Sequence, residues 1–165
     1  NVYAKHYQTG EVIPMDLVKK IQESEKYGQG FATVELVAAS LVDMDLHTLT
    51  EVPADFNVLI FEEQKLKERG IPSQILPRYR VTNFSHTMGG GYTAGYYSYL
   101  WAEVYECDAF QAYKEAGNIL DSSIAQRFRE TIVEPAGIDE GMVMYCNFRG
   151  RDPKIDGLLE NRGLK

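Results

Sequence analysis

The residues best suited to chemistry lie in one segment, residues 84–101, with the sequence FSHTMGGGYTAGYYSYLW. Three of its tyrosines, Tyr92, Tyr96 and Tyr99, follow an i, i+4, i+7 spacing, which predicts that their rings share one face of a helix. A phenol combines an apolar ring with a hydroxyl that donates or accepts a hydrogen bond. Such a row can line a groove for a peptide and direct hydroxyls at its carbonyl groups.

A glycine triplet and a histidine precede these tyrosines. Gly89-Gly90-Gly91 gives a backbone that can adopt positive φ and move, and His86 can donate a hydrogen bond near neutral pH. The pattern fits simple packing as well, because an aromatic stripe on a helix is usually core and a glycine triplet is usually a turn. The residue types alone leave a binding surface and a packed core both open.

No histidine lies in a spacing typical of a metal site. His6, His47 and His86 are far apart, and neither His-Glu-x-x-His nor Cys-x-x-Cys occurs. Asp43, Asp45 and His47 stand at i, i+2 and i+4, which does not place all three on one helical face. We therefore expect exposed or capping groups there, and we predict that this chain binds no metal by itself.

The elements that must position these residues are helices. Apolar residues recur at helical spacing, and no segment alternates as a strand bounded by hairpin turns. We therefore predict an all-α fold of about seven helices. The expected helices are 14–21, 31–47, one opened by Pro53 and ended by Gly70, 93–116, one capped by Asp121, one over 142–148, and a last one that begins with Asp152-Pro153 and ends at Gly163.

The chain suits a single domain spanning residues 1–165, since it has 165 residues of ordinary globular composition. Residues 71–91 form the longest stretch without a clear period, and a long loop in a compact domain is often functional. Residues 1–14 have the character of a connection that enters a domain, and Asn1 is not a natural start. We therefore expect a piece of a longer protein.

Charge and hydropathy exclude several partners. The net charge is −7, and the Lys and Arg residues form no long run, which argues against nucleic-acid binding. The sequence contains no apolar run long enough to span a bilayer and no signal-peptide pattern. Cys107 and Cys146 each sit among apolar residues, which favours free thiols and a cytoplasmic setting.

The tyrosine segment resembles the stretch that follows the zinc site in zinc metallopeptidases of the thimet-oligopeptidase family. Its flanks agree over the whole chain, and the central ones are similar to the dipeptidyl carboxypeptidase branch. The matching motifs are Thr9-Gly10-Glu11 before Ile13-Pro14, Phe31-Ala32-Thr33-Val34-Glu35, Leu41-Val42-Asp43-Met44, Phe148-Arg149-Gly150-Arg151-Asp152-Pro153 and Arg162-Gly163-Leu164.

The resemblance implies a role for each residue of the segment. Tyr99 matches the tyrosine that donates to the oxyanion of the tetrahedral intermediate, and Tyr92 matches a tyrosine that swings onto the substrate. His86 matches a histidine that helps to hold the substrate backbone or the oxyanion. Tyr96 matches a substrate subsite, and Gly90-Gly91 belongs to the substrate-binding loop that lets Tyr92 move.

The resemblance also implies a largely helical, two-lobed shell around a deep channel with zinc on its floor. There the zinc is held by the two histidines of a His-Glu-x-x-His helix and by a glutamate of the next helix, and the motif glutamate is the general base. None of these is found in this sequence. We therefore expect zinc only in the full-length enzyme, with the zinc-binding part upstream, and an inactive chain in isolation.

The implied activity is the release of C-terminal dipeptides from oligopeptides by a cytoplasmic peptidyl-dipeptidase. Two alternatives remain open: an oligopeptidase that cuts internal bonds, and a helical module that binds peptides without cutting them. The expected partners are an oligopeptide substrate, the upstream part of the same protein and, for the isolated chain, a second copy. We also expect the loop from Thr87 to Gly91 to be mobile.

Overall fold

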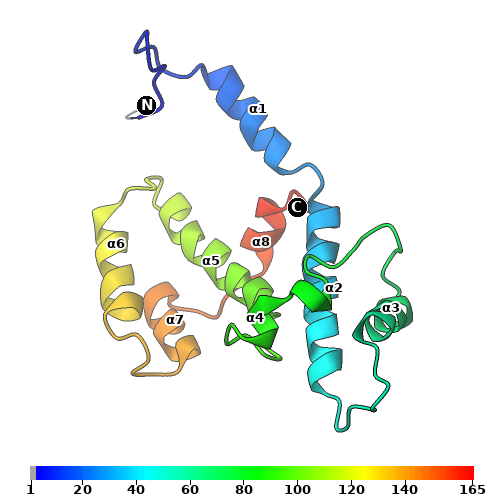
Figure 1. Ribbon diagram of the computed structural model, residues 1–165. Helices are drawn as coiled ribbons and strands as arrows, with labels where there is room; N and C mark the ends of the chain where they lie inside the picture. The colour runs from blue at the N-terminus through cyan, green and yellow to red at the C-terminus, as the bar shows by residue number, and fades with distance from the viewer. Residues whose placement is uncertain (1–2) are drawn as a thin grey trace.

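The computed structural model describes residues 3–165, and helices dominate it (Figure 1). Residues 1 and 2 of the predicted entry segment lie outside the described part. The prediction of an all-α fold is confirmed, since an isolated bridge between Lys5 and Val12 is the one β pairing among the described residues. The helices are α1 Met15–Glu25, α2 Gln29–His47, α3 Val58–Glu68, α4 Ser85–Met88, α5 Ser98–Glu115, α6 Ser122–Phe128, α7 Gly141–Arg149 and α8 Asp156–Asn161, with a 3₁₀ turn η1 Val81–Asn83 and a π-helical segment η2 Arg129–Val133.

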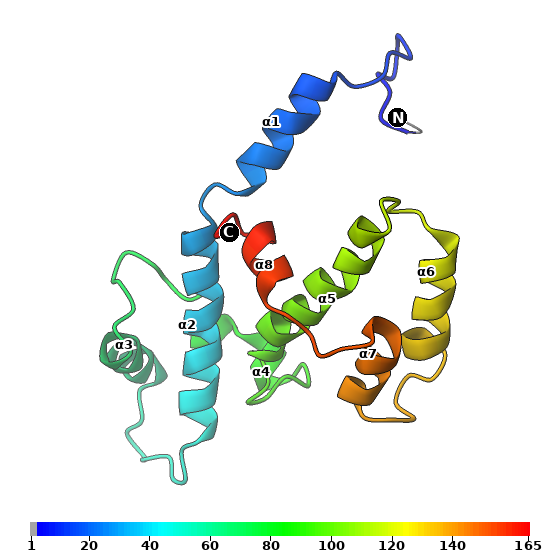
Figure 2. The same cartoon turned by 180° about the vertical axis from the view of Figure 1, so that it is seen from behind.

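Helix α2 lies at the centre of the molecule. Helix α3 packs on one side of it, and α4, α5 and α8 lie on the other (Figures 1 and 2). A core cluster forms where Leu36 and Ala39 of α2 meet Phe84 and Tyr96. The tyrosine segment is therefore anchored in the core through Tyr96. The buried residues of α2 are Leu36, Ala38, Ala39, Ser40, Val42 and Asp43.

A second cluster joins the C-terminal helices. Ala112 of α5, Ile124 of α6 and Phe148 of α7 are buried together. Helix α8 packs closely on α5, and Gly157 permits this approach because a Cβ there would lie 2.9 Å from the carbonyl oxygen of Cys107. Helix α5 thus connects the two clusters, running from α4 toward α6 (Figure 2).

Helix α1 stands apart from this body. None of its residues is buried, and it extends away from α2 in both views (Figures 1 and 2). Pro14 occupies its N-cap position, as predicted. Apolar side chains of α1, among them Leu17 and Ile21, remain exposed. Across residues 3–165, no helix has the combination of length and apolar character that crossing a membrane requires.

The start and the buried face of α3 differ from the prediction. The helix begins at Val58 rather than at Pro53, because the Asn57 side chain accepts hydrogen bonds from two backbone N–H groups of the first turn and caps the helix there. Helical spacing predicts an apolar face of Phe56, Leu59, Ile60 and Leu66. Leu59 and Ile60 are exposed instead, and the buried residues of α3 are Phe61 and Glu62.

The predicted starts of α5 and α8 are also wrong. Helix α5 begins at Ser98 rather than at residue 93, because Ala94 adopts a φ of 53°, outside the helical region. Helix α8 begins at Asp156 rather than at Asp152-Pro153. Asp152 instead accepts a hydrogen bond from the Cys146 thiol. Both cysteines are free, as predicted.

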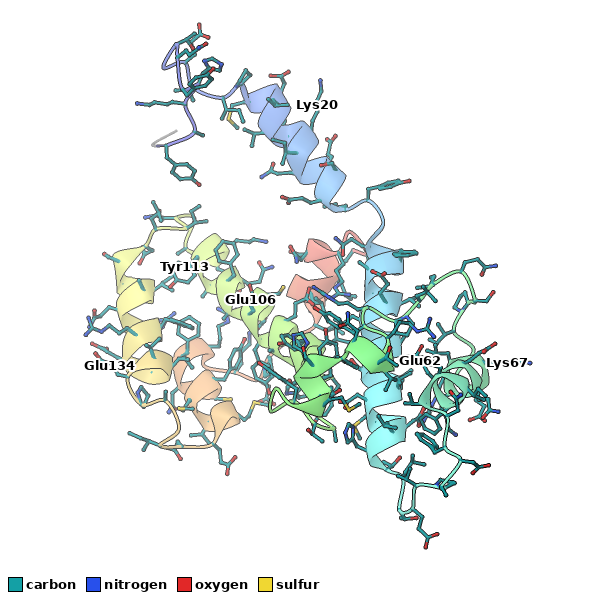
Figure 3. The ribbon with its side chains drawn as sticks, viewed as in Figure 1. Lys20, Glu62, Lys67, Glu106, Tyr113 and Glu134 are labelled. Carbon is teal, nitrogen blue, oxygen red and sulfur yellow. The ribbon has the colours of Figure 1, made fainter. Side chains whose placement is uncertain are left out.

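A buried glutamate fixes the backbone just before the tyrosine segment. Glu62 is 1% exposed, accepts a hydrogen bond from the backbone N–H of Val81 at 2.7 Å and pairs with Arg80. Figure 3 shows Glu62 on the side of α3 that faces α2, whereas Lys67 points away from the body. The 3₁₀ turn η1 is thereby held against α3, and α4 follows directly from it.

Candidate functional site

The tyrosine segment is a turn followed by a helix. Residues 93–97 form turns, and only Tyr99 of the three spaced tyrosines lies within α5. The prediction of a shared helical face is therefore wrong. The turn nevertheless brings the rings together: those of Tyr92 and Tyr99 stack with centroids 5.1 Å apart and planes 22° apart, and those of Tyr96 and Tyr99 lie 5.0 Å apart.

Solvent reaches two of these three rings. Tyr92 is 38% exposed and Tyr99 is 40% exposed, whereas Tyr96 is 3% exposed. Tyr96 contacts Phe84 edge-on, with ring centroids 4.7 Å apart. In this chain Tyr96 therefore supports the Tyr99 ring from the core, and its assignment to a substrate subsite stays a prediction.

His86 lies among these aromatic rings although it belongs to α4. Its ring centroid is 6.1 Å from that of Tyr92 and 6.3 Å from that of Tyr99. The structure thus brings together the three residues predicted to act in catalysis. The Nδ1 atom of His86 is buried and has no hydrogen-bond partner among the described residues. Buried polar atoms normally have partners, so this nitrogen is an exception in the described part of the chain.

The environment of Tyr99 keeps its hydroxyl protonated. Its interaction with the Tyr92 hydroxyl, followed by desolvation, raises the pKa of Tyr99 above its ordinary value. Burial likewise raises the pKa of Tyr96. Since an ordinary tyrosine already titrates only near about pH 10, an upward shift leaves the phenol neutral at physiological pH. Tyr99 is therefore a hydrogen-bond donor, which a group that stabilises an oxyanion must be.

The structure explains why two positions of the glycine loop require glycine. A Cβ at Gly90 would lie 2.9 Å from the Cα and the carbonyl oxygen of His86, and Gly91 adopts a φ of 82°. Gly90 therefore lets the loop pass close to His86, beside a hollow of about 550 Å³ that His86 itself lines. Thr87 is buried at the base of the loop, and its carbonyl accepts a hydrogen bond from the Thr93 hydroxyl at 2.7 Å. The roles of Gly90 and Gly91 in substrate binding, and the mobility of the loop, stay predictions.

The sequence interpretation of Asp43 is wrong. Asp43 is 1% exposed, and its carboxylate accepts hydrogen bonds from the backbone N–H groups of Ala94 and Tyr96. His47, one helical turn later, lies 2.9 Å from the same carboxylate. Asp45 has another partner, Arg69, which it binds through both carboxylate oxygens. A charged residue within the apolar run of α2 is the sequence signal that could have indicated a buried carboxylate.

Tyr79 is a second residue of the site that the sequence interpretation missed. Its ring stacks on Phe84 at 5.4 Å and lies 4.9 Å from that of His86. Tyr79 lies in residues 71–91, which have no helical or strand periodicity. Residue spacing therefore could not predict which side chains it packs against. Tyr79 is thus one of the aromatic rings that surround His86.

The described residues do not form a metal site. Within residues 3–165, no three His, Cys, Asp or Glu side chains gather where they could hold a metal ion. The Asp43 carboxylate accepts backbone amides, and the Asp45 carboxylate binds Arg69. The site described so far is therefore a group of aromatic and hydrogen-bonding side chains.

Comparison with known proteins identifies the family of the chain. The family described as peptidase family M3 matches residues 1–164. The chain belongs to peptidase family M3. It is 37% identical over 164 residues to a dipeptidyl carboxypeptidase of Salmonella typhimurium, covering 98% of this chain and 24% of that protein. It is 37% identical over 163 residues to oligopeptidase A of Escherichia coli, covering 97% of this chain and 23% of that protein. It is 39% identical over 169 residues to a probable cytosolic oligopeptidase A of Arabidopsis thaliana, covering 98% of this chain and 23% of that protein.

Membership of family M3 confirms the resemblance that the tyrosine segment indicated. The chain spans about a quarter of the length of these curated relatives. Proteins named dipeptidyl carboxypeptidase and proteins named oligopeptidase A match at 37–39% identity. The comparisons therefore establish a peptidase family and do not separate the two modes of cleavage.

Proposed function

We propose that this chain supplies the substrate-binding and transition-state-stabilising part of a cytoplasmic zinc peptidase that removes C-terminal dipeptides from oligopeptides. The main support for the proposal is that the rings of Tyr92, Tyr99 and His86 lie together in one half-exposed cluster. Membership of family M3 supports a peptidase. The proposed mode of cleavage is that of the proteins named dipeptidyl carboxypeptidase, which match at 37% and 38% identity.

In this proposal the Tyr99 hydroxyl donates a hydrogen bond to the oxyanion that forms when the scissile carbonyl becomes tetrahedral. The negative charge exists only in the transition state and intermediate, so the bond lowers the barrier without tightening substrate binding. Contact with the buried Tyr96 ring holds Tyr99 in place. A donor that is already oriented costs little reorganisation at the moment of reaction.

Tyr92 and His86 have supporting roles. Tyr92 follows Gly91, whose left-handed backbone forms the hinge from which the ring can move between Tyr99 and a bound peptide. His86 lines the hollow beside the glycine loop, and an imidazole ring there can form a hydrogen bond to the substrate backbone. Both act on the peptide by hydrogen bonding.

Zinc and the general base belong, in this proposal, to other parts of the whole protein, because the described residues offer no ligand set. None of the roles given to Tyr99, Tyr92 and His86 passes through a metal. The isolated chain should neither cleave peptides nor retain zinc after dialysis. Stoichiometric zinc together with chelator-sensitive cleavage by the purified chain would contradict this assignment.

The decisive experiment is Tyr99→Phe in the complete peptidase. It removes one hydroxyl and almost no volume, so kcat should fall roughly 10²- to 10³-fold, as for other oxyanion donors. KM should change little, because the bond forms mainly in the transition state. Tyr97→Phe is the matched control, since Tyr97 is 54% exposed and lies two residues away outside the ring cluster. Equal and mild effects of the two substitutions would refute the role of Tyr99.

An oligopeptidase that cuts internal bonds is the second candidate, supported by the identity to proteins named oligopeptidase A. Product analysis on one peptide with a free and with an amidated C-terminus separates the two. A dipeptidyl carboxypeptidase should release dipeptides from the free peptide and lose activity on the blocked one. Similar internal cleavage of both peptides would favour the oligopeptidase.

Self-association of the isolated chain is a further part of the proposal. Besides the exposed apolar residues of α1, an apolar groove of about 650 Å³ lies between α5 and α7, lined by Trp101, Phe110 and Met142 among others. Apolar surface of this kind is often covered by a partner. Light scattering at high concentration should show a dimer or larger species, and a clean monomer would contradict it.

A further inference from the structure

Asp43 is a buried carboxylate that holds two backbone amides of the tyrosine turn. Its Oδ1 atom accepts the N–H of Ala94 at 3.1 Å, and its Oδ2 atom accepts the N–H of Tyr96 at 3.0 Å. These partners are 51 and 53 residues away along the chain. Both oxygens of one carboxyl group therefore accept backbone amides of the same turn. The two hydrogen bonds fix the turn against α2.

The turn needs such an anchor because its backbone is strained. Ala94 adopts a φ of 53° and is the one non-glycine residue with positive φ in residues 3–165. Alanine rarely adopts this left-handed conformation, since its Cβ approaches a carbonyl oxygen. The bond to the N–H of Ala94 itself, together with the bond to Tyr96, holds the backbone on both sides of the strained residue.

His47 in turn orients the carboxylate. Its Nδ1 atom lies 2.9 Å from the Oδ1 atom of Asp43 and 2.8 Å from the Asp43 backbone oxygen. Both neighbours are acceptors, so Nδ1 must carry a proton. The pair has the i, i+4 spacing of one helical turn, and the His47 ring is partly exposed at the surface end of this chain of contacts.

The anchored residues are those that set the catalytic rings. Tyr92 lies two residues before Ala94, and Tyr99 lies three residues after Tyr96. The stacking of Tyr92 on Tyr99 and the contact of Tyr96 with Tyr99 therefore depend on the geometry of this one turn. A turn that relaxed toward helix would move Tyr92 relative to Tyr99.

We propose that Asp43, held by His47, is the positioning residue that fixes Tyr92 and Tyr99 relative to each other. This inference rests on the proposed function of Tyr99 and extends it to a residue of α2 that touches neither ring. Asp43 acts through the backbone of the turn, and Tyr99 remains the group that meets the substrate.

Hydrogen–deuterium exchange of the complete protein tests the anchor without reference to activity. Asp43→Asn replaces one acceptor by an amide NH₂, which opposes the N–H it faces, so segment 92–97 should exchange about tenfold faster or more. The matched control is Asp45→Asn, two residues along α2, because Asp45 binds Arg69 and not the turn. Unchanged exchange in segment 92–97 with Asp43→Asn, or the same acceleration with Asp45→Asn, would overturn the proposal.

A double-mutant cycle tests the link to Tyr99. Asp43→Asn should lower kcat about tenfold with KM little changed when Tyr99 is present, and should add a clearly smaller loss in a Tyr99→Phe background. Independent, additive losses would show that Asp43 acts by another route and would overturn the proposal. A Tyr99→Phe variant of normal activity would instead refute the proposed function of Tyr99, and the exchange result would still decide the anchor.

His47→Gln keeps the test available if Asp43→Asn does not fold. It leaves the carboxylate in place and removes the ring that orients it, so the same segment should exchange about threefold faster. Equal exchange in His47→Gln and the parent protein would remove His47 from the proposal.

Discussion

Two buried aspartates, Asp43 on α2 and Asp108 on α5, show how one residue type serves two purposes in this molecule. They are 1% and 2% exposed. Asp43 binds backbone amides of the tyrosine turn, whereas Asp108 binds the side chains of Arg151 and Tyr145. The difference indicates that Asp43 shapes a site and that Asp108 joins α7 and the segment after it to α5.

The surroundings of Asp108 form a network of charges. Arg151 contacts both of its oxygens, at 2.8 and 2.9 Å, and the Tyr145 hydroxyl donates to it. Arg149 lies 3.7 Å away and binds Glu115 through two hydrogen bonds. Its Nε atom is buried without a partner among the described residues. Loss of Asp108 should therefore affect the whole C-terminal half, and loss of Asp43 should affect one turn.

Asp108→Asn should produce the largest loss of stability. The substitution removes the ionised partner of Arg151 and the nearby charge that faces the buried Arg149. Breaking a buried pair from one side is costly. We expect the free energy of unfolding to fall by about 3 kcal/mol, measured by urea denaturation. Glu115→Gln is the control on the same helix, because that carboxylate is 60% exposed and should contribute less than about 1 kcal/mol. Equal losses of stability from Asp108→Asn and Glu115→Gln would contradict the structural role assigned to Asp108.

Tyr145→Phe should cost less than Asp108→Asn. It removes one hydrogen bond to a charged group and leaves the ring packed against Tyr105, so a loss of about 2 kcal/mol is expected. In an Asp108→Asn background the same substitution should cost clearly less, because the two groups share one network. Additive losses in denaturant titrations would show that Tyr145 stabilises the fold independently of Asp108.

Acid should remove part of the contribution of Asp108. Burial alone would raise the pKa of Asp108, but hydrogen bonds from Arg151 and Tyr145 outweigh it and lower the pKa below its ordinary value. A lowered folded-state pKa gives stability that is complete above the unfolded value of about 3.9 and is lost as pH falls through the folded value. The difference in unfolding free energy between the parent and Asp108→Asn should therefore narrow below about pH 4. A constant difference would mean that Asp108 has no titrating role.

Asn57→Ala should give the smallest of these effects. Asn57 caps α3, away from both aspartates, and its loss should cost about 1 kcal/mol of stability. Exchange in segment 92–97 should stay at the parent level in this variant. Faster hydrogen exchange in that segment would mean that the tyrosine turn responds to any loss of stability. It would argue against Asp43 as the specific anchor of the turn.

The sequence by itself determined the elements that depend on neighbours along the chain. The all-α class, the proline at the start of α1 and the cap of α6 by Asp121 follow from local spacing and local hydrogen bonds. The tyrosine segment also indicated the family, because its pattern of residues is specific. Each of these signals lies within a few residues of the feature it predicts.

Only the tertiary structure decided how the tyrosines meet. Spacing predicted one helical face, but Ala94 leaves the helix and a turn joins Tyr92 to Tyr99. That turn is held by Asp43 from 51 residues away, a partner that no local pattern contains. Its burial on α2 results from packing between helices, because a carboxylate in an apolar run is stable only when distant amides satisfy it.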